Sequence, residues 1–260
     1  AITLIRQNRD NPFFLYFPHY AVHSPLQAKQ SMIARYEAIP EKERQGQPAY
    51  AAMVESVDQS VGRVMETLSE LGLENNTMVI FTSDNGGLWK ATDHKPLRAN
   101  KVSHYEGSIR VPMIIKAPGI SKRGSVNSVA VITNDLYPTV LEVTRLPLRP
   151  YQHQDGLSLS ALLKGETALD REDLFWHYPH YNQHPHSAPV SIIRRGSWKL
   201  IEFLETGEIE LYNLSNDIRE TKNLAEAQPE RTRKLLSGLH EWQTEVGAEP
   251  MRANPYYEVR

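Results

Sequence analysis

Met78-Val79-Ile80-Phe81-Thr82-Ser83-Asp84-Asn85-Gly86-Gly87 is the stretch that predicts both the fold and a candidate site. Its first half is a short apolar run, typical of a strand buried in a sheet that helices cover on both faces. An acid, an amide and two glycines follow at once. Open α/β sheets build their sites at the carboxyl ends of strands, so Asp84 and Asn85 become candidate oxygen ligands.

The sequence around this strand predicts an α/β layer architecture. Residues 49–71 carry apolar side chains at helical spacing, with Pro48 ahead and Gly72 behind as start and stop signals. Helix, short loop and strand in succession are typical of α/β layers. The other elements expected in this part are a helix end followed by a buried strand at 12–17, strands at 113–116 and 128–133, and a helix through 137–143.

The pattern changes after about residue 150. Three short strand-like runs, at 190–194, 198–203 and 209–213, are separated by turn residues, which predicts an antiparallel meander. A last amphipathic helix is expected to start near Pro229. We therefore expect residues 1–150 to belong to a larger α/β domain and residues 151–260 to a smaller subdomain of antiparallel sheet plus helix.

Composition narrows the choice of partners and sites. With 40% hydrophobic and 23% charged residues, the chain has the make-up of an ordinary globular protein. Its formal net charge of -2 gives no basic excess, so nucleic acid is not an expected partner. No apolar run approaches the roughly 18 residues that a membrane span needs. The sequence contains no cysteine, which excludes thiolate zinc sites and a cysteine nucleophile within these residues.

Asp84 and Asn85 suit a hard cation. Calcium takes about 6 to 8 oxygen ligands, so these two side chains would supply only part of its coordination shell. The alternative is a plain turn, because Asp, Asn and Gly are turn formers in their own right, and on spacing alone the turn is favoured.

Several motifs, in order along nearly the whole chain, resemble those of the sulfatase family. They are Pro12-Phe13-Phe14-Leu15-Tyr16-Phe17 with His23-Ser24-Pro25-Leu26-Gln27-Ala28, residues 50–58, Thr82-Ser83-Asp84-Asn85-Gly86-Gly87, Pro96-Leu97-Arg98-Ala99-Asn100-Lys101, and residues 105–112. The resemblance implies an alkaline-phosphatase-like α/β sheet sandwiched by helices, with a small C-terminal subdomain. It also implies calcium-dependent hydrolysis of a sulfate ester, on a carbohydrate, by a formylglycine hydrate that attacks sulfur.

Carried over residue by residue, the resemblance gives roles to four side chains. Asp84 and Asn85 would be calcium ligands. Lys101 would bind a sulfate oxygen and stabilise the charge that grows during transfer. His23 would lie at the leaving-group side, where an imidazole that titrates near neutral pH can donate a proton. Without the resemblance, a loop histidine and a solvated surface lysine are the favoured interpretations.

The sequence also departs from the family pattern. The Cys/Ser-x-Pro/Ala-x-Arg motif that yields formylglycine is not present in these residues, nor are the acidic ligand pair and the lysine and histidine pair that usually lie upstream. We therefore expect a missing N-terminal part, expect these residues alone to be inactive, and expect a periplasmic or secreted protein from the resemblance. Ala99, Asn100 and Val102 stand where the family commonly has glycine.

A second cluster, Phe175-Trp176-His177-Tyr178-Pro179-His180-Tyr181-Asn182-Gln183-His184-Pro185-His186, resembles the substrate-side loop of carbohydrate sulfatases. His177 and His180 are the candidate substrate contacts. Structural packing is the next alternative, and a transition-metal site ranks well behind because no acids lie nearby. Two other functions stay open: a phosphoryl or phosphonate hydrolase of the same superfamily, and a non-catalytic glycan-binding protein on a degenerate sulfatase scaffold.

Overall fold

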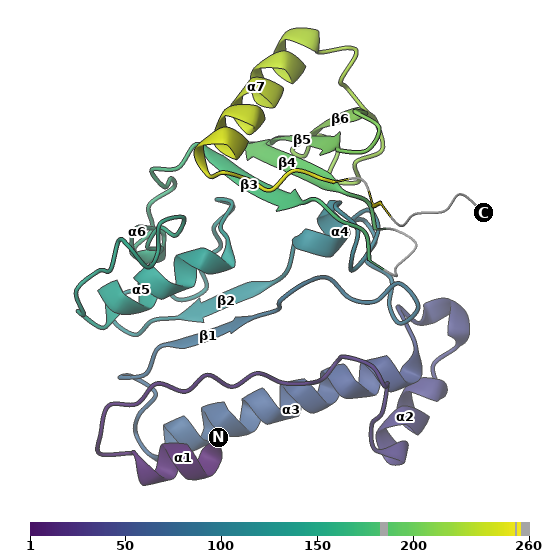
Figure 1. The fold of residues 1–260 in the computed structure, drawn as a ribbon. Helices are drawn as coiled ribbons and strands as arrows, with labels where there is room; N and C mark the ends of the chain where they lie inside the picture. The colour runs from purple at the N-terminus through teal and green to yellow at the C-terminus, as the bar shows by residue number, and fades with distance from the viewer. Residues whose placement is uncertain (183–186, 253, 256–260) are drawn as a thin grey trace. The chain divides into compact units, whose positions relative to one another are not determined.

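The computed structural model describes residues 1–182, 187–252 and 254–255 (Figure 1). The chain divides into two compact units. Unit 1 comprises Ala1–Ser83, Leu88–Asp93 and Pro112–Leu169, and unit 2 comprises Asp84–Gly87, His94–Val111 and Asp170–Arg260. The boundary proposed near residue 150 thus lies inside the last stretch of unit 1. Among the described residues, no helix is long and apolar enough to cross a membrane.

Unit 1 is built on one long helix. Its elements are α1 (Ile2–Gln7), α2 (Gln30–Glu37), the 3-10 turn η1 (Glu41–Glu43), α3 (Pro48–Glu70), β1 (Val79–Thr82), β2 (Met113–Lys116), the 3-10 turn η2 (Thr133–Asp135), α5 (Leu136–Val143) and α6 (Ser160–Leu163). Both α1 and α2 pack on α3. Figure 1 shows α1 and α3 on one side of the β1 and β2 pair and α5 on the other, which matches the expected layers.

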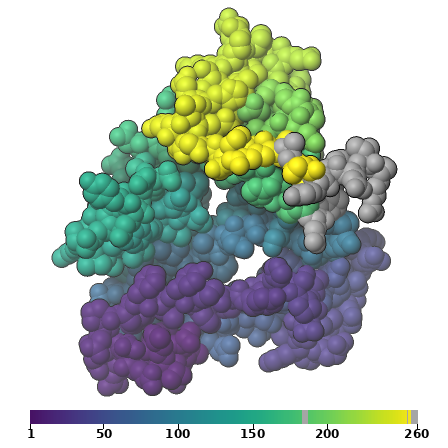
Figure 2. Space-filling view, viewed as in Figure 1, coloured from purple at the N-terminus to yellow at the C-terminus, as the bar shows by residue number. Residues whose placement is uncertain are grey.

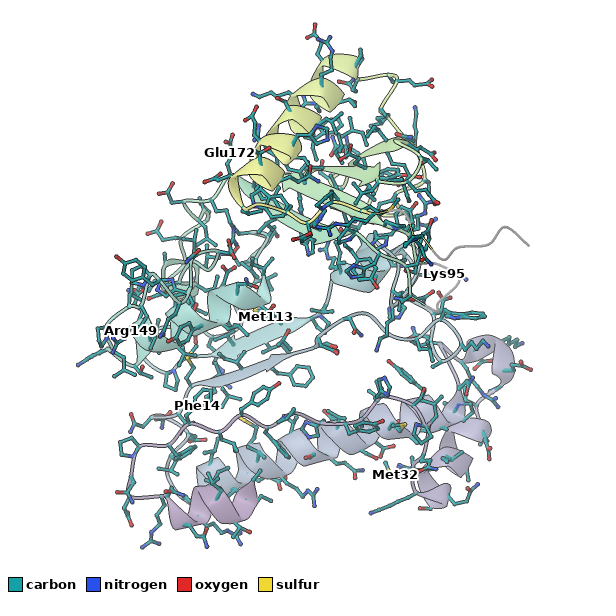
Figure 3. All side chains as sticks on the ribbon, viewed as in Figure 1. Phe14, Met32, Lys95, Met113, Arg149 and Glu172 are labelled. Atoms are coloured by element: carbon teal, nitrogen blue, oxygen red, sulfur yellow. The ribbon has the colours of Figure 1, made fainter. Side chains whose placement is uncertain are left out.

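The sheet of unit 1 differs from the expectation in extent. Strands β1 and β2 pair antiparallel, with Val79 opposite Lys116, and no described residue adds a third strand to them. Residues 12–17, expected to form a buried strand, are not in a strand, and Phe14 and Tyr16 are each 77% exposed. Figure 3 labels Phe14 on this segment. Residues 128–133 form no strand either. An apolar run becomes a strand only when a neighbouring edge accepts its backbone hydrogen bonds, and sequence pattern cannot report that edge.

Unit 2 contains a four-stranded antiparallel sheet with one helix packed on it. Its elements are α4 (Glu106–Ile109), β3 (Asp173–Tyr178), β4 (Val190–Arg195), β5 (Trp198–Phe203), β6 (Ile209–Asn213) and α7 (Pro229–Glu245). The strands pair in sequence order β3-β4-β5-β6. The predicted meander and final helix are confirmed, and β3, which runs through the aromatic and histidine cluster, was not predicted as a strand.

The two faces of this sheet carry different cores, because side chains alternate along each strand. The face toward α7 buries Ile193, Leu200 and Leu211 against Leu235 and Leu239 of the helix. Figure 2 shows α7 lying over the sheet. The opposite face has its own buried cluster, made of Val190, Ile192, Ile201, Tyr212 and Leu214. Lys199 is the neighbour of Leu200 on β5 and therefore belongs to this second face.

Candidate functional site

Asp84 and Asn85 lie directly after β1, in the turn Asp84–Gly87. The Asn85 backbone N–H donates to Asp84 Oδ1 at 2.9 Å, and Asn85 Nδ2 donates to the Gly86 carbonyl at 2.9 Å. Asp84 is exposed and Asn85 is half-buried. These local bonds fix the conformation of the turn and hold two oxygen-bearing side chains next to each other.

Backbone hydrogen bonds join this turn to two other segments, 98–101 and 106–108; we call the three together the stacked loops. Gly86 N–H donates to the Ser108 carbonyl at 2.7 Å, Lys101 N–H donates to the Gly87 carbonyl at 3.0 Å, and Gly107 N–H donates to the Arg98 carbonyl at 2.9 Å. A Cβ at Gly86 would lie 1.9 Å from the Gly107 carbonyl oxygen, so only glycine permits this approach. The stacked loops therefore bring Lys101 into the same unit and the same hydrogen-bonded set as Asp84 and Asn85.

The segment around Lys101 has an unusual backbone. Ala99 and Val102 have φ angles of 59° and 78°, whereas Asn100 does not have a positive φ. Of the three residues that stand where the family commonly has glycine, two therefore adopt the left-handed conformation that glycine favours. For a β-branched valine this is a genuine outlier, and such strain persists only where surrounding contacts hold it.

Val102→Gly is expected to stabilise unit 2. Relief of the strain at φ 78° outweighs the entropy that glycine adds to the unfolded chain, for a net gain of about 1 kcal/mol in the free energy of unfolding. Urea denaturation measures it. Val126→Gly is the matched control, because Val126 is 94% exposed and has no positive φ, and it should lower stability slightly. If the urea midpoint fell equally in both variants, Val102 would not be strained.

His23 belongs to unit 1, in the segment before α2. The ring is exposed, and its Nδ1 lies 2.9 Å from the Ser24 carbonyl oxygen. A carbonyl only accepts, so Nδ1 carries the proton in this contact and the neutral ring presents Nε2 as an acceptor. When protonated, the same Nε2 becomes a donor that points away from the backbone contact. The protonated ring could therefore donate from Nε2, which suits the general-acid role expected for His23.

The two candidate substrate histidines occupy different surroundings. His177 lies on the α7 face of β3, where its Nδ1 is 2.7 Å from Ser191 Oγ and its Nε2 is 2.8 Å from the Glu249 carbonyl oxygen. Both ring nitrogens of His177 therefore have protein partners. His180 is exposed and packs edge-on against Tyr178, at 4.3 Å between ring centroids. The other two histidines of the cluster, at 184 and 186, lie outside the described residues.

His104 is a further ring close to the candidate site that sequence reasoning missed. It follows Lys101 by three residues and packs against Tyr178, with ring centroids 5.7 Å apart. Burial lowers the pKa of His104, so the ring is neutral near pH 7. Among the described residues, its Nε2 has no hydrogen-bond partner. The sequence could have pointed to His104 through its position three residues after Lys101.

The side-chain oxygens of Asp84 and Asn85 are the kind of ligand that a hard cation binds, but they are fewer than the roughly 6 to 8 oxygens that calcium takes. Asp84 and Asn85 offer carboxylate and amide oxygens, the ligands that calcium prefers. Within the described part of the chain, no group of three or more His, Cys, Asp or Glu side chains could hold a metal ion. These two residues would therefore contribute one side of a coordination shell.

Comparisons with known proteins identify the family of this chain. The sequence model of the sulfatase family matches residues 1–146, and that of the C-terminal region of N-sulphoglucosamine sulphohydrolase matches residues 99–246. A sulfatase of Formosa agariphila is 40% identical over 243 residues, which cover 86% of this chain and 44% of that protein. Bovine arylsulfatase K is 33% identical over 192 residues, covering 72% and 34% respectively.

Solved structures with a similar fold include proteins determined with bound carbohydrates. The crystal structure of Ps i-CgsB in complex with k-i-k-neocarrahexaose is similar with a TM-score of 0.80 and 31% identity, over 93% of this chain and 52% of that one. A structure in complex with its substrate D-glucosamine-2-N,6-O-disulfate is similar with a TM-score of 0.67 and 28% identity, over 80% and 42%. The chain thus spans about half the length of these proteins or less.

Proposed function

Because this chain belongs to the sulfatase family, we propose that the whole protein hydrolyses a sulfate ester carried by a carbohydrate. The observation that supports the proposal is the set of stacked loops, whose backbone hydrogen bonds join the segment of Lys101 to the turn that carries Asp84 and Asn85. An anion-binding cation and a partial calcium site in one place suit a sulfuryl group.

Each side chain has a distinct part in the proposed reaction. Lys101 binds a sulfate oxygen and stabilises the negative charge that develops there. Asp84 and Asn85 would hold one side of a calcium ion, which would supply positive charge beside the sulfuryl group. His23 donates a proton from Nε2 to the departing alkoxide. The attacking oxygen would come from formylglycine, whose sequence motif these 260 residues do not contain.

Substrate contact is proposed for the aromatic and histidine cluster, which begins in β3 and continues beyond it. His180 is exposed beside Tyr178, and such rings bind sugar faces and hydroxyls. His177 is engaged by Ser191 and Glu249, so its proposed contribution is to hold β3 and the segment after α7 in place. Two similar solved structures were determined with a neocarrahexaose and with a glucosamine disulfate, which supports a sulfated glycan as substrate. A periplasmic or secreted location is part of the same proposal.

Sulfate release by the whole protein tests the function. Sulfated oligosaccharides and an aryl sulfate should both be hydrolysed, and chelation of calcium should abolish the activity. Asp84→Ala should weaken calcium binding and lower kcat by about 100-fold, since a ligand to the catalytic ion is lost. Asp10→Ala, which removes an exposed carboxylate of unit 1, is the control.

The same assays distinguish the alternative functions. Release of phosphate but not sulfate would favour a phosphoryl hydrolase of the same superfamily. Glycan binding without any hydrolysis would favour a non-catalytic protein on a degenerate sulfatase scaffold.

A further inference from the structure

Unit 2 contains a buried group of charges that the proposed chemistry does not use. The Lys199 ammonium lies 3.2 Å from Glu106 Oε1 and 2.8 Å from Glu220 Oε1. The side chains of Lys199 and Glu220 are 0% exposed and that of Glu106 is 1% exposed. Within the described residues, Glu106 Oε2 accepts no hydrogen bond, and guanidinium nitrogens of Arg110 and Arg194 lie 3.7 and 3.9 Å from it. We call Glu106, Lys199 and Glu220 the buried triad.

The triad connects the sheet to the lysine segment at one end. Glu106 opens α4, and its backbone N–H donates to Glu220 Oε2 at 2.7 Å. Lys199 comes from β5 on the face away from α7, and Glu220 follows β6. The start of α4 is therefore bonded to the sheet through both its side chain and its backbone.

The other end of the same segment is tied to the same place. Arg98 Nη1 donates to the Tyr212 hydroxyl at 2.9 Å and to the Glu220 carbonyl at 2.8 Å. Its guanidinium also stacks over Tyr105, 3.7 Å from the ring centroid. Residues 98–106 thus form a loop whose two ends are both fixed by Glu220 and its neighbours, and Lys101 lies inside that loop.

Backbone strain coincides with these attachments. Ala99 and Val102 lie within the loop and have positive φ angles, and Glu220 itself has a φ of 53°. Residues held in such conformations relax unless the surrounding contacts over-determine them. Charge-assisted hydrogen bonds in a water-excluded place are among the strongest constraints a protein can supply.

We propose that Lys199 and Glu220 are positioning residues for Lys101: the side chains of the buried triad fix the Glu106 end of the 98–106 loop, the backbone carbonyl of Glu220 holds the Arg98 end, and together they set where the Lys101 ammonium meets the substrate's sulfate. This rests on the proposed function, because Lys101 is the sulfate-binding group there. Neither Lys199 nor Glu220 touches substrate in this scheme, and both act through the loop.

Fold stability alone does not account for such a triad. Two carboxylates and one ammonium leave water, and well-packed apolar residues are often as good for stability. Burial raises the pKa of the Glu220 carboxyl, because desolvation opposes its ionisation more than the neighbouring Lys199 favours it. The α7 face of the same sheet already has an apolar core of its own. The charged hydrogen bonds add a fixed orientation, because they hold the 98–106 loop to the sheet in one geometry.

Lys199→Met in the whole protein is the test, with Arg195→Met as matched control. Arg195 is a cation of the adjacent strand that forms a bidentate pair with Asp173 on the α7 face of the sheet, opposite the face that carries Lys199. Three quantities are measured in both variants: amide hydrogen exchange of residues 98–107, kcat and KM for an aryl sulfate, and affinity for inorganic sulfate by calorimetry. The melting temperature reports general destabilisation.

In Lys199→Met, we expect lost amide protection in 98–107, weaker sulfate binding and a kcat/KM lower by about 100-fold, as for an ångström-scale misplacement of a catalytic group. Arg195→Met should keep all three even though it also removes an ion pair of the same sheet. Glu220→Gln, which keeps size and the bond from the Glu106 amide, should give an intermediate loss and decides the matter if Lys199→Met does not fold.

The inference and the function can fail separately. Unchanged exchange and unchanged kcat/KM in a folded Lys199→Met or Glu220→Gln variant would overturn the positioning role. An equal loss in the Arg195→Met control would also overturn it, since the effect would then be general. If the unaltered protein released no sulfate, the proposed function would be wrong, and so would the role of the triad in positioning Lys101. Faster amide exchange of residues 98–107 in Lys199→Met would still show that the triad anchors the 98–106 loop to the sheet.

Discussion

Lys101→Ala in the whole protein is expected to lower kcat/KM for sulfate esters by about 100- to 1000-fold. Removal of one preorganised cation or hydrogen-bond donor from developing charge has this cost in other enzymes. Because the charge on the sulfuryl oxygens grows toward the transition state, kcat should fall as well as kcat/KM. Steady-state kinetics on an aryl sulfate and on a sulfated oligosaccharide measure the effect on both substrates.

The control for this prediction is Lys122→Ala, because Lys122 is an exposed lysine of unit 1. Lys101→Arg keeps the charge with a different shape and should recover only part of the loss, since a guanidinium does not replace a compact ammonium. A Lys101→Ala enzyme with unchanged kcat and a raised KM would mean that the lysine binds substrate and transition state equally well. Full activity would remove Lys101 from the site.

His23→Ala is expected to separate substrates by their leaving groups. Alkyl and sugar sulfates should slow by about 100-fold, because an alkoxide needs a proton as it departs, whereas aryl sulfates should slow far less. The Nδ1 contact with the Ser24 carbonyl supports this role, since it reserves Nε2 for the proton transfer. A plot of log kcat/KM against the pKa of the leaving group should become steeper in the variant.

His240→Ala is the matched control, since His240 is an exposed histidine whose Nε2 pairs with Glu202. It should leave the plot unchanged. Equal losses on alkyl and aryl sulfates in His23→Ala would assign His23 to sulfate binding in place of proton transfer.

The sequence predicted those elements whose signal is local. Helix α3, strands β1 and β2, helix α5, the meander and helix α7 all have periodicity, turn residues or caps within their own length. The strand expected at 12–17 had the same apolar signal, but a strand also needs a partner edge, which no local pattern encodes. Strand β3 was missed because its aromatic and histidine residues suggested a binding loop before they suggested a strand.

The candidate site divides in the same way. Asp84, Asn85 and Lys101 are found from short motifs, and the glycine-like conformations of Ala99 and Val102 could be suspected from the family pattern. The pairing of Lys199 with Glu106 could not, since 93 residues separate them and each alone looks like a surface charge. The different surroundings of His177 and His180 arise because His177 lies within β3, on its α7 face, whereas His180 follows the end of the strand, and this is visible only once β3 is placed.

The close approach at Gly86 and Gly107 has a consequence for how related genes are classified. A Cβ at Gly107 would lie 2.2 Å from the Ala99 carbonyl oxygen, and one at Gly86 would meet Gly107 itself. Natural selection for a folded protein is enough to retain both glycines, even in a lineage that has lost catalysis. Asp84 and Lys101 are under no such steric demand, and under the proposed function one would be a calcium ligand and the other a sulfate contact. Genome surveys built on that proposal would separate active enzymes from pseudoenzymes by those two positions and use the glycines only to identify the scaffold.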